Sequence, residues 1–232
     1  MVGTMDSRRV AYLKALDIDV WERRDLAPAA AVAVEMPAAD SGAQPGWAEL
    51  ERAVKSCTLC PLHKTRTQGV FGVGNRAAQW MVIGEAPGAD EDRQGEPFVG
   101  RAGQLLNSML KAIGLKREHV FIANILKSRP PNNRDPKPEE VQACIPYLFR
   151  QIELVNPLLI LCVGRIAAQT LLETDTPIGK LRGQLHRIAG NRPMVVTYHP
   201  AYLLRSPGEK RKSWADLLLA LRTFEQATGA AT

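Results

Sequence analysis

The sequence predicts a three-layer α/β/α domain in which helices cover both faces of a four-stranded parallel sheet. Three observations lead to this prediction. Four short runs of apolar residues are spaced along the chain, helical patterns separate them, and the runs are apolar throughout. Strands of that composition are buried on both faces, and right-handed crossovers through helices join them.

Each predicted element follows from a local pattern. Residues 104–113 place large apolar side chains on one face of a helix. Residues 138–155 begin with Pro138 and two glutamates, which the positive end of a helix dipole favours. The expected strands are 79–84, 120–124, 158–163 and 194–198; the further helices are 47–56, 166–172 and 214–224; and residues 180–192 are expected to form a small hairpin.

Composition divides the chain into four parts. Residues 1–26 carry a short helical pattern and are interpreted as an N-terminal peptide. Residues 27–46 are rich in alanine, proline and glycine without periodicity, which is typical of a linker. The domain itself is expected at 47–226, followed by a tail at 227–232.

Charge and cysteine content restrict the class of protein. The 232 residues carry a net charge of +6, which favours a polyanionic partner. The N-terminus lacks the apolar segment of a signal peptide, and the longest apolar run is far too short to span a bilayer. We therefore expect a cytoplasmic protein that does not associate with a membrane. Four cysteines, two of them in CTLC at 57–60, are compatible with disulfides, a redox pair or metal ligands, and a reducing compartment disfavours disulfides.

Residues 84–103, GEAPGADEDRQGEPFVGRAG, directly follow an apolar run. A strand that ends in such a glycine-rich turn places backbone N–H groups and side chains at the carboxyl edge of the sheet, where open α/β folds build their sites. Phe98 is an apolar ring within this polar loop, which favours a binding site for a flat molecule. The alternative interpretation is an acidic surface loop that its glycines keep flexible.

Three polar residues close or directly follow predicted strands: Glu85, Asn124 and His199. Because the carboxyl ends of parallel strands meet at one edge of a sheet, we expect these side chains to share a cleft. For His199, which precedes a proline, the alternative is a strand-end residue that is hydrogen-bonded to backbone.

The glycine-rich stretch, together with HPAYLL at 199–204, resembles the two signature motifs of the family 4 uracil-DNA glycosylases, a bacterial and archaeal group that holds an iron–sulfur cluster. The resemblance covers roughly residues 47–224. It implies the uracil-DNA glycosylase fold and a DNA repair enzyme that flips uracil out of DNA and hydrolyses its N-glycosidic bond, leaving an abasic site. Neither motif contains a lysine that could form a Schiff base, which argues against lyase activity.

The same resemblance implies roles for individual residues. Phe98 would stack on the uracil, and Asn124 would pair with N3–H and O4, a pattern that cytosine mismatches. His199 would donate to uracil O2 as negative charge develops. Glu85 would orient or activate water or stabilise the cationic sugar, since an alanine stands where the better-known uracil glycosylases carry a water-activating aspartate. The other predicted substrate-binding residues are Gly84, Ala86, Pro87 and Gly88.

Apolar side chains beside a base pocket can fill the hole that a flipped nucleotide leaves in the duplex. We expect Leu203 or Leu204 in that role and Arg205 as a contact to phosphate or base. The alternative is that both leucines cap the core.

The segment KSRPPNNRDPK at 127–137 is basic and rich in proline. Prolines stiffen a loop and so lower the entropy that it loses on binding. This pattern predicts a DNA-facing loop in which Lys127, Arg129 and Arg134 contact phosphates.

The family holds its [4Fe–4S] cluster with four cysteines, and three of them match Cys57, Cys60 and Cys144. The other position is Ser128 in this chain. A serine oxygen is a harder donor than a thiolate and keeps its proton more firmly, so we expect a more labile cluster. Three alternatives remain: a cluster held by three cysteines with Ser128 or water, no cluster, or zinc or another ligand. Cys162 lies in an apolar strand and is expected to be a buried free thiol.

Residues 7–25 are similar to the N-terminal peptide of the psi subunit of the bacterial DNA polymerase III clamp loader. This similarity implies a docking segment for a replisome component. The alternative is a peptide that packs on the domain or is disordered.

The leading hypothesis is therefore a monomeric enzyme that acts on uracil-containing DNA. A second hypothesis is a uracil-DNA-binding sensor or replisome-associated module without turnover. A third, a metal-dependent phosphoesterase that uses the acidic residues 90–92, is disfavoured because histidine and carboxylate ligands are sparse elsewhere.

Overall fold

The structure is a computed structural model that describes residues 46–188 and 190–229. These residues belong to one compact unit of the chain, residues 44–232. The predicted N-terminal peptide lies outside the described residues, and so does the predicted linker apart from its last residue.

The sheet has four parallel central strands, as predicted, and two antiparallel edge strands that the prediction did not include. The strand order is β1-β3-β2-β4-β6-β5. Strands β3, β2, β4 and β6 are parallel neighbours, while β1 pairs antiparallel with β3 and β5 with β6. Their bounds are β1 Val73–Gly74, β2 Trp80–Gly84, β3 Phe121–Asn124, β4 Leu159–Val163, β5 Leu185–Ile188 and β6 Arg192–Thr197. The hairpin predicted at 180–192 is confirmed only in part: β5 lies within these bounds, but its partner β6 begins at their last residue and is the strand that was predicted separately at 194–198.

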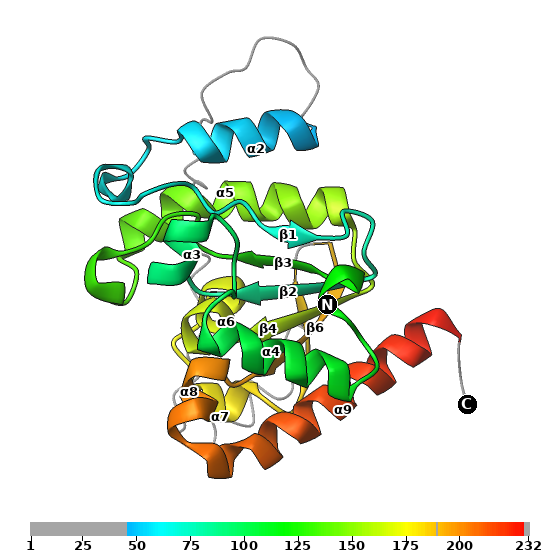
Figure 1. Cartoon of the computed structure of the whole chain (residues 1–232). Coiled ribbons are helices and arrows are strands. Elements are labelled where there is room, and N and C mark those ends of the chain that lie inside the picture. The colour runs from blue at the N-terminus through cyan, green and yellow to red at the C-terminus, as the bar shows by residue number, and fades with distance from the viewer. Residues whose placement is uncertain (1–45, 189, 230–232) are drawn as a thin grey trace, which may run out of the picture. The chain divides into compact units, whose positions relative to one another are not determined.

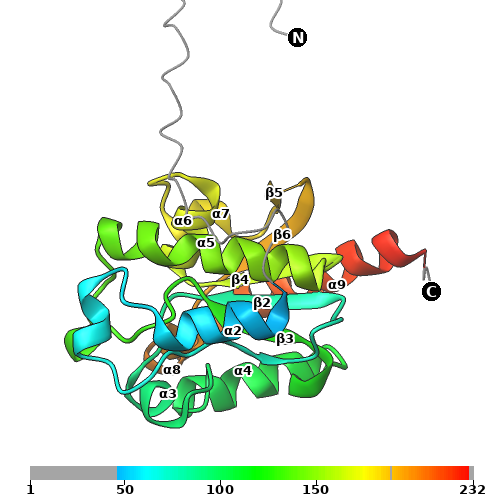
Figure 2. The same ribbon diagram turned by 90° about the horizontal axis from the view of Figure 1, so that it is seen from above.

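Helices cover both faces of the sheet, which confirms the three-layer α/β/α architecture (Figures 1 and 2). Alternate residues of each central strand face opposite layers. In β2, Met81 and Ile83 pack in one cluster with side chains of α2, α5 and α6, while Trp80 and Val82 pack in another with α4, α8 and α9. Burial on both faces explains why these strands are apolar throughout.

The helices agree with the predicted bounds to different degrees. Helices α2 and α5 have the predicted limits, whereas α9 extends beyond its apolar stretch at both ends. Within the described part of the chain, no helix combines the length and the apolar character needed to cross a bilayer. The helical bounds are α2 Trp47–Ser56, α3 Ala89–Gln94, α4 Arg101–Ala112, α5 Pro138–Val155, α6 Arg165–Leu172, α7 Ile178–Leu181, α8 Pro200–Arg205 and α9 Lys210–Thr228, with 3₁₀ turns η1 Pro61–Lys64, η2 Arg117–His119, η3 Pro131–Asn133 and η4 Pro207–Glu209.

Candidate active site at the carboxyl edge of the sheet

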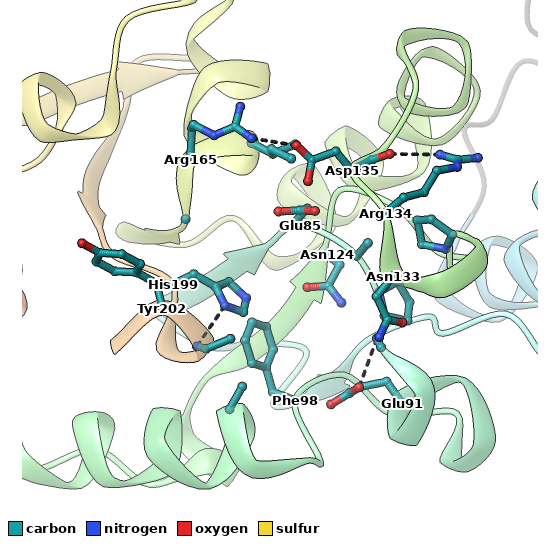
Figure 3. Close-up of a pocket in the computed structure, with 18 of the residues that line it drawn as sticks. Glu85, Glu91, Phe98, Asn124, Asn133, Arg134, Asp135, Arg165, His199 and Tyr202 are labelled. Carbon is teal, nitrogen blue, oxygen red and sulfur yellow. Dashed lines mark hydrogen bonds and ion pairs between the residues drawn. The ribbon is translucent and has the colours of Figure 1, made fainter. Parts of the chain in front are cut away.

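A pocket of about 760 Å³ lies at the carboxyl ends of the four parallel strands. Residues that follow β2, β4 and β6 line it together with the last residue of β3. Glu85, Asn124 and His199 all face it, which confirms the prediction that they share a cleft (Figure 3). Open α/β sheets place their ligand sites at this edge because the loops there leave the strands side by side.

The loop after β2 is held in shape by the carboxylate of Glu91. This carboxylate accepts hydrogen bonds from the backbone N–H groups of Gly88, Val99 and Gly100, at 3.1, 2.9 and 3.1 Å. Arg117 donates to the carbonyl oxygens of Pro97 and Phe98 from the other side. A loop fixed by bonds to its own backbone can present a rigid surface to a ligand.

Phe98 is the aromatic wall of the pocket, and its placement requires two glycines. Its φ of 54° is in the left-handed region that residues other than glycine rarely adopt, a strain that often marks functional sites. A Cβ on Gly84 would lie 2.6 Å from the Phe98 ring and 2.5 Å from Asn124 Oδ1. A Cβ on Gly103 would overlap the Phe98 carbonyl oxygen. The sequence therefore needs glycine at both positions to seat this ring.

Asn124 ends β3 beside Gly84 of β2, and its side chain is 3 % exposed. Its Oδ1 is one of the few buried polar side-chain atoms in the described residues that have no hydrogen-bond partner. A buried acceptor without a partner costs roughly 1–3 kcal/mol. The atom is therefore poised to accept a hydrogen bond from a donor in the pocket.

His199 begins α8, and its Nδ1 accepts a hydrogen bond of 3.1 Å from the backbone N–H of Ala201. Burial lowers the pKa of His199 to about 4, and the positive charge of Arg205 acts in the same direction. The imidazole is therefore neutral near pH 7. Because Nδ1 is the acceptor, the proton is on Nε2, which makes that nitrogen the donor toward the pocket.

The His199 ring lies against two neighbours. Its centroid is 5.6 Å from that of the Phe98 ring, at an interplanar angle of 30°. On another side it packs over Gly164, where φ is +105° and an added Cβ would be 3.2 Å from His199 Cβ. The aromatic wall and the hydrogen-bond donor are thus held next to each other.

Glu85 follows β2 and is half-buried, and none of the described residues hydrogen-bonds its carboxylate. Burial, with a smaller contribution from the charge of Asp135, raises the pKa of Glu85 to about 7, and the charge of Arg165 acts against this shift. A carboxylate with a pKa near neutrality can both exist as an anion and accept a proton, which suits a general base.

The pocket thus combines four chemical features: a flat aromatic wall, an unpaired amide oxygen, an N–H donor on a neutral imidazole and a carboxylate with a raised pKa. Together they are suited to a planar heterocycle that presents a donor next to acceptors. The carboxylate could then act on a group attached to that ring.

Comparison with known proteins agrees with this chemistry. Residues 71–219 match the model of the family described as the Uracil DNA glycosylase superfamily. The chain is 50 % identical over 175 residues to the type-4 uracil-DNA glycosylase of Archaeoglobus fulgidus. The aligned region covers 72 % of this chain and 88 % of that protein. The type-4 uracil-DNA glycosylases of Pyrobaculum aerophilum and Thermotoga maritima are 44 % and 46 % identical, over 74 % and 66 % of this chain and 91 % and 80 % of their own. The chain belongs to the type-4 uracil-DNA glycosylase family.

Not every residue predicted from the type-4 motifs lies where it was expected. Ala86, Pro87 and Gly88 line the pocket and Gly84 lies against the Phe98 ring, while their role in binding substrate stays a prediction. Leu203 does not face DNA: it is 1 % exposed and packs in the core with α4 and α9, so the prediction that it can plug the duplex is wrong. Leu204, the next residue of α8, is 37 % exposed and remains a candidate.

The prediction that Lys127 contacts phosphate is also wrong, because this residue is 1 % exposed. Its ammonium donates to the backbone oxygen of Asn124 and to Gln151 Oε1, each at 2.7 Å. Arg129 and Arg134, in the same segment, are partly exposed, and Arg134 lines the pocket while it pairs with Glu140. Lys127 therefore supports the strand that carries Asn124.

The type-4 motifs gave no indication of two charged residues on the rim of the pocket, Asp135 and Arg165. They form an ion pair of 2.8 Å (Figure 3). Arg165 comes two residues after β4, so the reasoning that found Glu85 and His199 at strand ends applies to it as well. Tyr198 and Tyr202, whose ring centroids are 5.0 Å apart, line the pocket too.

The predicted cluster ligands gather beside the first half of α5. Cys60, Cys144 and Ser128 are buried, and Cys57 is partly buried. Burial raises the pKa of the Cys144 thiol to about 11, the charges of the other two thiols act in the same direction, and Lys127 opposes them. Burial and the charges of the neighbouring thiolates therefore both disfavour ionisation of Cys144.

Arg66 occupies the space between Cys57 and Ser128. Its guanidinium donates to Ser128 Oγ at 2.8 Å and to the backbone oxygens of Lys55 and Cys57, each at 2.9 Å. Among the described residues, no three histidine, cysteine or carboxylate side chains are arranged to hold a metal ion. Thiolates are the usual ligands of iron–sulfur clusters, so the three cysteines have the donor chemistry for one, while Ser128 is already engaged by Arg66.

Proposed function

We propose that this protein removes uracil from DNA by hydrolysing the bond between uracil N1 and C1′ of deoxyribose, and that it leaves an abasic site. An enzyme cannot reach the reacting atom of a base that is stacked inside a duplex, so the nucleotide must leave the stack and enter the pocket before it reacts. Phe98 then receives one face of the base, and such stacking contributes about 1–3 kcal/mol per base.

Asn124 selects uracil by the direction of its hydrogen bonds. Its Oδ1, which has no partner among the described residues, accepts from uracil N3–H, while its amide donates to O4. Cytosine presents an acceptor at N3 and a donor at C4, so both bonds would be mismatched. A site with buried polar groups rejects such an analogue strongly because those groups are left unpaired.

The bond-breaking step moves an electron pair from the C1′–N1 bond onto the base. Negative charge accumulates on uracil O2, where the Nε2–H of His199 stabilises it. Water attacks the cationic C1′, and the Glu85 carboxylate accepts the proton that this water loses. An anionic Glu85 also stabilises the positive sugar, and both effects need its deprotonated form.

The observation that carries this proposal is the unpaired Asn124 Oδ1 beside the Phe98 ring. A buried amide oxygen that faces an apolar ring in an open pocket has the geometry needed to read a pyrimidine N3–H. The fold by itself would be compatible with many activities.

The test measures release of free uracil, in a chelating buffer, from oligonucleotides that contain uracil, cytosine or thymine at one position. We expect turnover on uracil alone, and we expect Asn124→Ala to lower kcat/KM by about 10-fold or more because two hydrogen bonds are lost. Asn107→Ala, an exposed asparagine on α4, is the matched control. Tight binding of uracil-DNA without release would instead support a sensor, and activity that requires magnesium would support a phosphoesterase.

For the cofactor, we propose that Cys57, Cys60 and Cys144 would hold an iron–sulfur cluster, with Ser128 at the sequence position where the family has its other cysteine ligand. When bound, the cluster would pin the segment around 127–137 and take no part in the bond-breaking step. Iron and sulfide analysis with visible spectra of anaerobically purified protein tests this. We expect a cluster that is lost faster from the wild type than from Ser128→Cys, whereas absence of iron from both proteins would contradict the proposal.

We further propose a monomeric cytoplasmic protein whose residues 7–25 dock on a clamp-loader component. Their similarity to the psi peptide supports this, and the segment lies outside the described residues. A labelled peptide of this sequence should bind clamp-loader subunits with an affinity close to that of the full chain. Equal binding by a chain that lacks residues 1–26 would contradict it.

A further inference from the structure

The Glu85 carboxylate lies in the pocket and has no hydrogen-bond partner among the described residues. The proposed reaction nevertheless needs this carboxylate as an anion. All three side chains line the pocket, and Figure 3 shows the Glu85 carboxylate next to the ion pair that Asp135 and Arg165 form with each other. These two residues come from different segments, the loop before α5 and the first turn of α6.

Arg165 is held in place from two sides. Its Nη2 donates to Asp135 Oδ2 at 2.8 Å, and its Nη1 donates to Gln169 Oε1 at 3.2 Å. The Asp135 side chain is 70 % exposed and the Arg165 side chain 51 % exposed. An ion pair that exposed contributes only about 0–1 kcal/mol to stability. Its position next to Glu85 is therefore more informative than its contribution to the fold.

The other charged and titratable groups that line the pocket have different partners. Arg134 is bound by Glu140 through two hydrogen bonds, and Glu91 is bound by loop N–H groups. Between β6 and α8, His199 is neutral near pH 7 because burial lowers its pKa to about 4. Asp135 and Arg165 are the residues whose charges act on Glu85, in opposite directions; the remaining ionisable residues of the lining are Tyr198, Tyr202 and Arg205.

We propose that the Asp135–Arg165 ion pair sets the charge state of Glu85 for the reaction, with Arg165 as the positioning residue that keeps this carboxylate anionic. This inference rests on the proposed function. Arg165 attracts the anion directly, and Asp135 holds Arg165 at the rim while it repels the same anion. A DNA phosphate near the rim would add negative charge and make Arg165 more necessary in the complex.

The two residues therefore predict opposite shifts in a pH–rate profile. Single-turnover uracil release is measured between about pH 5.5 and about pH 9, where the loss of rate at low pH reports protonation of the catalytic base. Arg165→Gln should move this acid limb to higher pH by about 0.5–1 unit, and Asp135→Asn should move it to lower pH by a similar amount. The double variant should lie close to the wild type.

An exposed arginine–aspartate pair outside the pocket gives a matched control. Arg93 and Asp90 on α3 are 2.6 Å apart and do not line the pocket. Arg93→Gln and Asp90→Asn should leave the acid limb where it is in the wild type. Limbs that do not move in the Arg165 and Asp135 variants, or that move in the same direction, would overturn the proposal.

Arg165 could instead bind a phosphate, and that role has another signature. Arg165→Gln would then raise KM at every pH and weaken the salt dependence of binding, with the limb unmoved. A direct titration of the Glu85 carboxyl by ¹³C NMR, assigned with Glu85→Gln, needs no activity. If the NMR pKa values shift oppositely but no uracil is released, the proposed function fails and this inference stands. If uracil is released and those pKa values do not shift, the inference alone fails.

Discussion

The placement of Glu85 in the pocket lowers the free energy of unfolding, and the size of this effect depends on pH. Its folded-state pKa of about 7 lies above the usual 4.5, so the folded protein holds a proton that the unfolded chain releases between these values. Ionised Glu85 therefore destabilises the fold above pH 7, and the effect vanishes below about pH 4.5. Active sites often carry such strain.

We predict that Glu85→Gln makes the protein more stable by about 1–3 kcal/mol at about pH 8 and leaves stability unchanged near pH 4.5. Urea unfolding of both proteins at the two pH values measures this difference. The control is Glu118→Gln, since the Glu118 side chain is 69 % exposed. A gain in stability that is equal at both pH values would show that Glu85 is not destabilised by its charge.

At the scale of elements, the start of α4 supports the loop that carries Phe98. Gly103 lies in the first turn of this helix, directly against the Phe98 carbonyl oxygen. We predict that Gly103→Ala forces the loop to shift, lowers stability by about 1–3 kcal/mol and slows uracil release. Gly179→Ala on α7, where an added Cβ meets nothing within 4 Å, should do neither. Full activity of Gly103→Ala would contradict the close fit that places Phe98.

Helix α8 carries two adjacent leucines, Leu203, which is buried, and Leu204, which is exposed. Substitution of each by alanine therefore compares the same change in a buried and in an exposed position. Leu203→Ala empties a buried site and should cost about 2–5 kcal/mol of unfolding free energy. Leu204→Ala removes an exposed side chain and should change stability by less than about 0.5 kcal/mol. If Leu204 fills the duplex, its variant should lose activity on double-stranded DNA more than on single-stranded DNA. Equal losses on both substrates would rule out that role.

At the scale of the whole molecule, the four parallel strands and the pocket at their carboxyl ends could be predicted because burial on both faces leaves continuous apolar runs. Strand β1 has two residues, too few to show any pattern, and β5 is an edge strand whose Leu185 is exposed. Both edge strands were consequently not predicted as strands of the main sheet.

The errors within the site have a different cause. Lys127 lies in a basic, proline-rich segment, and its burial depends on Gln151, a residue on α5 that local sequence does not connect to it. Leu203 and Leu204 are both apolar, and only the packing of α8 on α4 and α9 decides which is buried. Asp135 and Arg165 form a pair between distant segments, so neither residue carries a signal by itself.

Uracil excision by this pocket requires that segments far apart in sequence close around one extruded base. A crystal structure of the protein with DNA that contains 2′-fluoro-2′-deoxyuridine tests this most directly, because the fluorine destabilises the cationic sugar and blocks cleavage. We expect the uracil to stack on Phe98, with N3 within hydrogen-bond distance of Asn124 Oδ1 and O2 within that distance of His199 Nε2. A uracil that stays within the helix, or that binds away from these three side chains, would contradict the account.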